Sequence, residues 1–364
     1  MKNTRNKRYC AWSYKIFLLL VFVSVIFLKH LNILADTYEE EIHSSINTFF
    51  ELDKKANLYN TTPCFNSIIE STSLLDEINS KYEFERQWRT KLDYSILSYN
   101  YIIKATIKEI KDNIAKVYVE RDLEFTMTTS PKIPQKSQNE RFVFILKEVN
   151  RVWKIIDYCY EEENPDYFDT LTTDDLGDGF RDFPGDWSNR LNNIDTLLSD
   201  FKSIGTKNIS LNKFYLSKGS VNQEKVADYA EKYALLRNPL YRDFEEYGGD
   251  CTNFISQALY YGGLDQTEDW KPYTYPWIRV RDLRDYLIYN ELAQESTKIG
   301  ESFLGEIVQF STTNYDSWSH SAIITYKLPN DDYLYCCHSY DKLNYPLSKS
   351  YPLIYPKIRV LDFN

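Results

Sequence analysis

GGDCTNFISQAL, residues 248–259, is the most informative stretch of this 364-residue chain. Its two glycines allow backbone angles that other residues resist, so we expect a tight turn before Asp250. Gly262 and Gly263 follow shortly afterwards and are typical of a helix end. The stretch therefore predicts a turn and then a buried helix that begins near Cys251. The apolar side chains between these points recur at helical spacing: Phe254, Ile255, Ala258 and Leu259.

Cys251 is predicted to lie at the N-terminus of this helix. The unpaired N–H groups and the positive dipole end at that position stabilise a thiolate and lower the pKa of a thiol. The same N–H groups could stabilise an oxyanion that forms on a substrate. Asp250 is expected either to cap the helix or to take part in the chemistry.

The number of cysteines supports an unpaired thiol. Cys10 precedes a long apolar run, which leaves an odd number of cysteines beyond it. A Cys64–Cys159 disulfide is one possible pairing. Cys336 and Cys337 are adjacent, so we expect them on opposite faces of a strand. No pair has the CxxC spacing of a structural zinc site, and we predict no metal. The six cysteines are Cys10, Cys64, Cys159, Cys251, Cys336 and Cys337.

Two histidines follow Cys251 along the chain. His320 begins an apolar run that is typical of a strand, and His338 lies in a second such run, 333–340. A hairpin between these runs would place the two histidines side by side. We therefore expect Cys251 as the nucleophile, His320 as its base and His338 as the residue that orients His320.

Four segments resemble the putative amidase domain family, a bacterial branch related to the NlpC/P60 peptidases with a papain-like α+β fold. The resemblance implies the same nucleophile and base, Cys251 and His320, and a polar orienting residue on the next strand. His338 fits that third role, but Ser339 and Asp341 lie close by and leave it open. The four segments are NPLYRDF (238–244), GGDCTNFISQAL, WSHSAIIT (318–325) and LYCCHSYD (334–341).

Residues 37–160 predict a separate α+β domain in which helices precede a curved antiparallel sheet. Apolar residues at helical spacing indicate a helix around Ile42–Phe50, and a second helix is expected over 65–78. The order of elements and the final strand VWKIIDY resemble the domains related to nuclear transport factor 2 (NTF2-like). No catalytic cluster occurs in this domain, so we expect a spacer or an interaction module. The expected strands are 99–110, 114–128, 141–149 and 151–158, with the last two joined at Asn150.

Residues 1–36 predict export from the cytoplasm. A basic flank precedes the largely apolar run Ile16–Leu28, which contains no charged residue. The run has the length of a signal-peptide core, and an extension past Lys29 would make it an uncleaved membrane anchor. The segment is therefore expected to be a signal peptide or an N-terminal anchor, and the protein to be extracytoplasmic.

Residues 161–219 predict an acidic linker with a connector helix over 191–201, ahead of the amidase-like domain at 220–364. Asp174 and Asp178 resemble part of a calcium loop, but Leu176 and Gly185 occupy positions where acidic ligands are needed, so no calcium site is expected. Ser220 and Gln223 fit a capping box at the start of the last domain. The net charge of −10 disfavours nucleic acid as a partner.

These observations predict an extracytoplasmic, cysteine-dependent amide hydrolase without a cofactor. Peptidoglycan peptides or related wall amides are the expected substrates, by analogy with the family. The alternative is a non-catalytic, membrane-anchored module that binds a peptide or a protein. A metal-dependent hydrolase is disfavoured because the sequence has no HExxH or comparable cluster.

Overall fold

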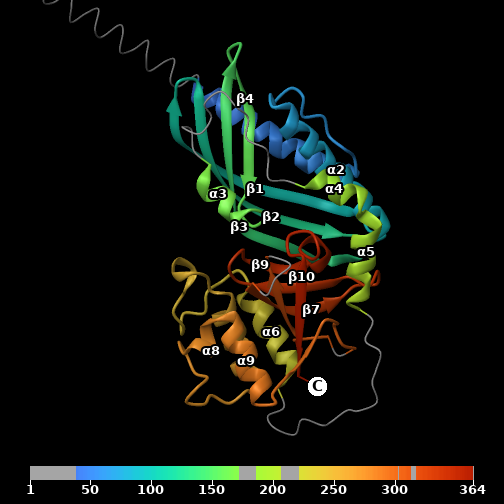
Figure 1. The fold of residues 1–364 in the computed structure, drawn as a ribbon, viewed down its shortest axis with the longest axis vertical. Helices are drawn as coiled ribbons and strands as arrows, with labels where there is room; N and C mark the ends of the chain where they lie inside the picture. Colours follow the sequence, from blue (N-terminus) through green and yellow to red (C-terminus); the bar gives the residue numbers. More distant parts are fainter. Residues whose placement is uncertain (1–37, 172–185, 206–220, 302, 313–316, 364) are drawn as a thin grey trace, which may run out of the picture.

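The computed structural model describes residues 38–171, 186–205, 221–301, 303–312 and 317–363. The predicted signal or anchor, the rejected calcium loop and Ser220 lie outside these ranges. Within them, no helix has the length and apolar character needed to cross a membrane. The described chain is α+β, with helices packed around an antiparallel sheet (Figure 1).

The first unit contains two helices and four strands, as the sequence predicted, although the third strand begins at Ser130 instead of residue 141. Its second helix begins later than expected, because residues 65–70 contact the sheet, where Glu70 N donates to Ile155 O at 3.0 Å. The Ser71 hydroxyl then accepts from Leu74 N at 3.3 Å and caps the helix. The elements are a helix at 38–59, α2 (Thr72–Lys91), β1 (Ile96–Lys111), β2 (Ile114–Met127), β3 (Ser130–Val149) and β4 (Val152–Tyr160).

A two-residue turn joins β3 to β4 at the predicted position. Asn150 and Arg151 both have positive φ angles, 53° and 66°, which is the geometry whose twist suits a tight hairpin. Val149 and Val152 pair directly across the turn. The prediction of a hairpin at Asn150 is therefore confirmed.

Short helices connect the first unit to the rest of the chain. They are α3 (Pro165–Thr170), α4 (Trp187–Asn192) and α5 (Ile194–Ser203). The single predicted connector helix is thus two helices that meet at Asn193. Phe201 of α5 packs against Trp88 of α2, with ring centroids 6.0 Å apart, so the connector covers the junction between the units.

The C-terminal unit places helices on one face of a group of strands. Its first helix is capped by Asn222, whose side chain accepts from Lys225 N at 3.0 Å, so the cap lies two residues after the predicted capping position. The helical elements are α6 (Gln223–Tyr233), η2 (Glu245–Tyr247), α7 (Cys251–Tyr261), α8 (Tyr275–Ile278), α9 (Val280–Tyr289) and η3 (Leu347–Lys349). The strands are β5 (Gln294–Ser296), β6 (Ile307–Ser311), β7 (Trp318–Lys327), β8 (Tyr333–Cys337), β9 (Lys342–Pro346) and β10 (Lys357–Asp362).

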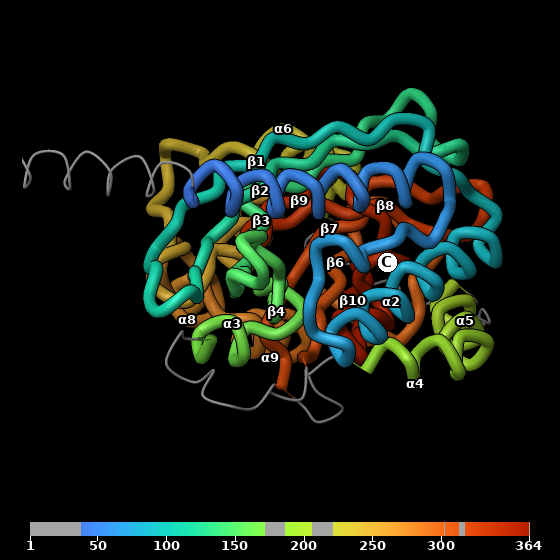
Figure 2. The backbone as a smooth tube through the Cα atoms, turned by 90° about the horizontal axis from the view of Figure 1, so that it is seen from above, coloured from blue at the N-terminus to red at the C-terminus, as the bar shows by residue number. Residues whose placement is uncertain are grey.

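One sheet runs through both units of the described chain. The strand order is β1-β2-β3-β9-β8-β7-β6-β10-β5, and β4 also pairs with β3. The two halves of the sheet join at β3 and β9, where Lys136 pairs with Leu343 and Ser137 with Lys342. Figures 1 and 2 show the green strands of the first unit beside the red strands of the second.

The junction between the units is also a shared core. Phe84 and Trp88 of α2 belong to the same buried cluster as Val308, Ala322 and Tyr355 of the C-terminal unit. Next to this cluster, the ammonium group of Lys342 forms a buried ion pair with the carboxylate of Glu162, which follows β4. The side chains of Tyr160 and Tyr355 donate to the same carboxylate at 2.6 and 3.3 Å.

Glu162→Gln should lower the free energy of unfolding by about 3 kcal/mol, because it leaves Lys342 charged, buried and without its partner. Urea denaturation measures this loss. The control is Glu120→Gln, which breaks the exposed Lys104–Glu120 pair and should change stability by less than about 1 kcal/mol. Equal losses in the two variants would contradict a structural role for the buried pair.

Candidate active site

The turn before α7 has the strained geometry that its two glycines predicted. Gly248 and Gly249 have φ angles of 103° and 107°, a region that other residues rarely adopt. A Cβ atom on Gly249 would lie 3.0 Å from Ser339 Oγ. The same hydroxyl accepts from Asp250 N at 2.7 Å, so the turn is fixed against the segment after β8. The helix begins at Cys251, as expected.

Asp250 does not cap the helix with its side chain. One carboxylate oxygen accepts from Phe244 N at 3.0 Å and from the Asn253 amide at 2.8 Å. The other accepts from His338 Nδ1 at 2.6 Å. Asp250 therefore connects the lead-in loop, the first turn of α7 and His338.

His338 has partners at both ring nitrogens. Nε2 lies 2.7 Å from the carbonyl oxygen of Tyr233, and the ring stacks on Phe254 with centroids 4.2 Å apart. Both ring nitrogens are therefore engaged by groups of the protein itself, so His338 ties α6, the start of α7 and the end of β8 together.

Cys251 is buried, and its thiol lies against the main chain of β7. The sulfur contacts Thr252 Oγ1 at 3.8 Å and takes part in a backbone hydrogen bond with Ser321, the residue after His320. Burial raises the pKa of the thiol to about 11, and hydrogen bonds from Thr252 and Ser321 only partly offset this. The expected lowering of the pKa by the helix terminus is thus outweighed by loss of hydration in this conformation.

His320 lies in an aromatic cluster on β7. Its ring stacks on Phe310 and Tyr355, with centroids 5.7 and 5.8 Å away, and meets the edge of Tyr340 at 6.2 Å. Burial, assisted by the positive charge of Lys342, lowers the pKa of His320 to about 3. Its Nε2 atom is buried without a hydrogen-bond partner. The imidazole is therefore neutral and has a nitrogen available.

The thiol and the imidazole reach β7 at consecutive residues. The Cys251 sulfur is at the Ser321 main chain, and His320 Nε2 makes no hydrogen bond to it within the described part of the chain. Because the thiol resists deprotonation and the imidazole resists protonation, proton transfer between them is unfavourable in this resting state.

The register of β7 and β8 separates His320 from His338. Ile323 pairs with Cys336, so His338 would lie opposite Ser321 and not opposite His320. Side chains alternate along a strand, which puts the two histidines on different faces. Strand β8 also ends at Cys337, before the positive-φ residues Ser339 and Tyr340. The expected side-by-side pair is therefore not formed.

The surroundings of His320 include residues that the sequence did not indicate. Tyr355 stacks nearly parallel to the ring, at 11°, and its hydroxyl donates to Glu162 of the first unit. Lys342 pairs with that same carboxylate. No local pattern connects Glu162 to His320, because these distant segments come together through the pairing of β3 with β9 and the core shared by the two units.

The remaining cysteines and the possible metal ligands form neither a disulfide nor a metal site within the described residues. All five cysteines in the described residues are free, and Cys64 is exposed whereas Cys159 is buried. Cys336 and Cys337 belong to different core clusters, as their expected opposite faces require. Across the described ranges, no three His, Cys, Asp or Glu side chains gather in a way that could hold a metal ion.

Residues 220–359 match the family model described as the putative amidase domain. Two Bacillus subtilis proteins are similar to this chain. The uncharacterised protein YjcM is 34% identical over 32% of this chain and 31% of its own length. The uncharacterised protein YhbB is 25% identical over 37% of this chain and 47% of its own length. The similarity thus spans less than half of either relative.

A solved structure of a putative aromatic ring hydroxylase from Novosphingobium aromaticivorans aligns with 33% of this chain and 87% of its own. Its TM-score is 0.22 and its sequence identity 9%, so it carries no argument about fold or function. The family match supports an amide-hydrolysing C-terminal unit.

Alkylation of Cys251 by iodoacetamide should be slow at neutral pH and accelerate steeply as the pH approaches about 11, because only the thiolate reacts and burial disfavours it. Mass spectrometry of the peptide that carries Cys251 measures the rate, with exposed Cys64 as the accessible reference. Circular dichroism at each pH checks that the protein remains folded. Rapid labelling of Cys251 at neutral pH would contradict a protonated resting thiol.

His320→Phe should make the protein less sensitive to acid. The folded pKa of about 3 lies below the unfolded value of 6.5, so only the unfolded chain takes up this proton between those pH values. Stability should therefore fall as the pH drops from 6.5 towards 3, by up to about 1.4 kcal/mol per pH unit from this group. Urea unfolding across that range should show a shallower slope in His320→Phe, and an unchanged slope would contradict the burial of a neutral imidazole.

Proposed function

We propose that the C-terminal unit is a cysteine-dependent amide hydrolase with Cys251 as nucleophile and His320 as base. The main support is that the helix-terminal thiol contacts the main chain of Ser321, the residue next to His320, whose buried Nε2 is unpaired. The match of residues 220–359 to an amidase model supports amide cleavage independently.

In the proposed reaction, the Cys251 sulfur attacks the carbonyl carbon of an amide while His320 accepts the thiol proton. The carbonyl oxygen becomes an oxyanion, for which the N–H groups at the start of α7 are the available donors. His320 then gives its proton to the departing amine as the C–N bond breaks. Water, activated by the same imidazole, releases the acyl group from the thioester and restores the thiol.

The resting site must change before this reaction can begin. Burial opposes the charge on both the thiolate and the imidazolium, so the neutral pair is the stable state. A substrate that brings its own polar amide group to the thiol would improve the environment of the charged pair. Proton transfer is therefore proposed to follow substrate binding.

His338 is proposed to act at a distance from the chemistry. Its bonds to Asp250 and to the carbonyl of Tyr233 tie α6 to the start of α7. In this role it positions Cys251 through Asp250, instead of orienting the ring of His320. Ser339, which accepts from Asp250 N, supports the same turn.

The finer assignments belong to this proposal. We propose that the C-terminal unit is a papain-like domain related to the NlpC/P60 peptidases, and that the first unit is NTF2-like. The protein is proposed to work outside the cytoplasm, secreted or held by residues 1–36. Peptidoglycan peptides or related wall amides are the proposed substrates, because an exported chain meets them there.

A non-catalytic module that binds a peptide or a protein is the second candidate. The raised pKa of the Cys251 thiol favours it, since a binding surface needs no thiolate. Binding without cleavage would be its signature.

Cys251→Ala should reduce release of amines from purified peptidoglycan or acyl peptides by about 10³-fold or more, because no other group supplies the nucleophile. His320→Gln should cause a comparable loss. Cys64→Ala, which changes an exposed thiol, should leave the rate unchanged. Chromatography of the released amines measures all four proteins.

Equal product release by wild type and Cys251→Ala would overturn the cysteine mechanism. If neither cleaves the panel but both bind the same peptide equally well, the binding module is supported instead.

A further inference from the structure

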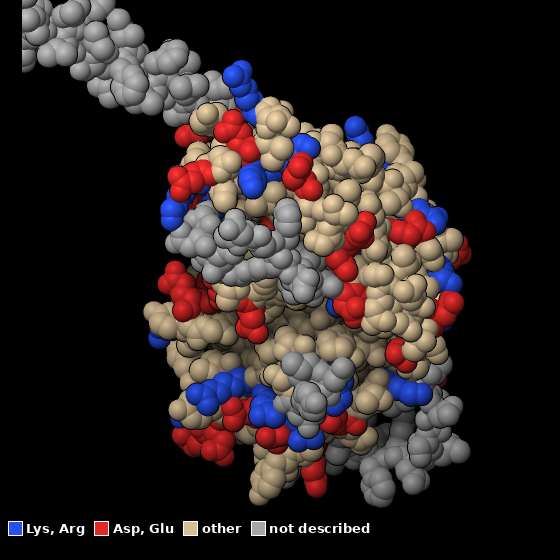
Figure 3. Space-filling model, turned by 45° about the horizontal axis from the view of Figure 1, so that its top comes forward, with Lys and Arg blue, Asp and Glu red and all other residues tan. Residues whose placement is uncertain are grey.

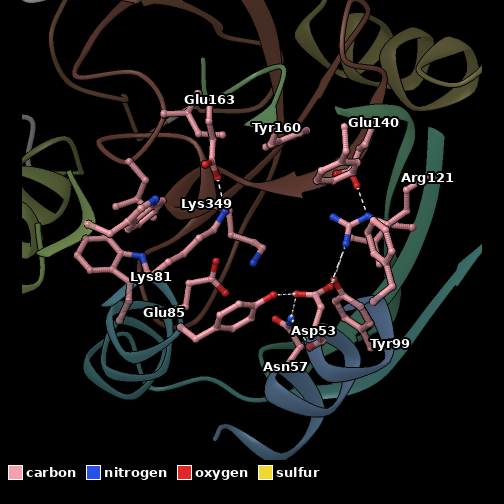
Figure 4. A pocket seen from close by; sticks show the side chains of 18 of the residues that line it. Asp53, Asn57, Lys81, Glu85, Tyr99, Arg121, Glu140, Tyr160, Glu163 and Lys349 are labelled. Carbon is pink, nitrogen blue, oxygen red and sulfur yellow. Dashed lines mark hydrogen bonds and ion pairs between the residues drawn. The ribbon is translucent and has the colours of Figure 1, made fainter. Parts of the chain in front are cut away.

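A cavity of about 100 Å³ lies at the junction of the two units. The first unit lines it with the helix 38–59, α2 and the sheet, and the C-terminal unit closes it with four residues after the start of β9 (Figure 4). Neither Cys251 nor His320 borders it. The four closing residues are Tyr345, Lys349, Leu353 and Ile354.

Several of the charged groups in this cavity are already paired. Lys81 Nζ lies 2.6 Å from Glu163 Oε1. The Arg121 guanidinium bridges Glu140 at 2.6 Å and Asp53 at 2.9 Å. These groups have little capacity left for a ligand, because Asp53 also accepts from three more side chains: Asn57, Tyr82 and Tyr99.

Two cations from different units have donors to spare. Lys349, at the end of η3, has no ion pair or hydrogen bond within the described ranges, although it is in the same cavity as Glu85. Arg89 is 1% exposed, and its Nη2 atom has no partner. The one carboxylate that meets Arg89 is Glu85, at a long 3.4 Å.

Lys349 and Arg89 are held near each other. Trp88, beside Arg89 in the sequence, donates from Nε1 to the carbonyl of Ser348, beside Lys349, at 3.0 Å. Burial lowers the pKa of Lys349, Glu85 opposes this and the charge of Arg89 adds to it. The charges that line the cavity balance, with four cations and four carboxylates, but at this end Lys349 and the Nη2 atom of Arg89 have donors that no acceptor in the described residues fills.

We propose that the cavity binds a small carboxylate anion between Lys349 and Arg89. The two oxygens of a carboxylate can accept from one donor on each of these two cationic side chains. The size also fits. A cavity of roughly 150 Å³ accommodates benzene, so this smaller cavity suits an anion with fewer atoms than benzene has.

The bound carboxylate would connect the two units. Lys349 belongs to the C-terminal unit and Arg89 to α2, so the anion completes an ionic contact across their junction. Figure 3 shows acidic and basic side chains interspersed on one outer face of the molecule, whereas Lys349 and Arg89 line the cavity at the junction. The site is independent of the proposed amide chemistry, because its ligand does not reach Cys251.

The test measures binding of sodium propionate to the full chain by isothermal titration calorimetry and by the shift in thermal unfolding. Propionamide is the neutral control of the same shape, and sodium chloride equalises the ionic strength. Wild type should bind propionate and not propionamide. Lys349→Met should weaken binding by about tenfold or more, and Lys349→Arg should restore most of it.

Two further variants keep the result interpretable. Glu85→Gln removes the internal competitor and should tighten propionate binding by several-fold, about the effect of one weak ion pair. Lys104→Met changes an exposed lysine outside the cavity and should bind as wild type does.

Equal responses to propionate and propionamide would overturn the proposal, as would unchanged binding in Lys349→Met. Absence of propionate binding in both wild type and Glu85→Gln would also overturn it, because the donors would then bind no carboxylate even without their internal competitor. Inorganic phosphate in place of propionate tests the charge preference, since tighter phosphate binding would contradict a carboxylate site. None of these readouts depends on amidase activity.

Discussion

The buried ion pair between Lys342 and Glu162 is the contact on which the arrangement of the two units depends. It lies where β9 pairs with β3, so a short stretch of backbone ladder and one pair of charges join the halves of the sheet. Taking two charges out of water is costly unless their partners are fixed. Tyr160 and Tyr355 each donate a hydrogen bond to the Glu162 carboxylate, and Tyr355 also stacks on His320.

This arrangement places the proposed base under the influence of the first unit. Lys342 contributes to the low pKa of His320, and Tyr355, which stacks on the ring, is bonded to Glu162. The first unit therefore shapes the electrostatic surroundings of the proposed chemistry. The proposed carboxylate site lies in the same junction, with Lys349 separated from Tyr355 by only a few residues of chain.

Much of the fold could be predicted from the sequence. The alternation in β1–β4, the Asn150 turn and the glycines before Cys251 each reflect local backbone preferences, and the structure has these features. The late start of α2 was not predictable, because it depends on the bond from Glu70 to Ile155. The continuous sheet was also missed, since the pairing of β3 with β9 joins residues some two hundred positions apart and has no local signature.

The residues of the candidate site could be predicted from the sequence, but their side-chain orientations, burial and pKa values could not. The Cys251 motif and the strand with His320 are visible in the sequence, whereas the side to which each side chain turns depends on register. The expected partnership of His338 with His320 failed because strand alternation separates them. Helix-dipole reasoning gave the wrong direction for the thiol pKa because it did not include burial.

The short β3–β9 connection also bears on how the two units could be separated. A fragment that began near residue 220 would present β9 as an unpaired edge, with the ammonium of Lys342 exposed among apolar side chains. Unpaired edge strands of this kind tend to pair with strands of other chains and cause aggregation. The stretch that matches the family model therefore depends on the first unit in this protein. Expressing it alone would require a substitute for Glu162 and for the hydrogen bonds of β3.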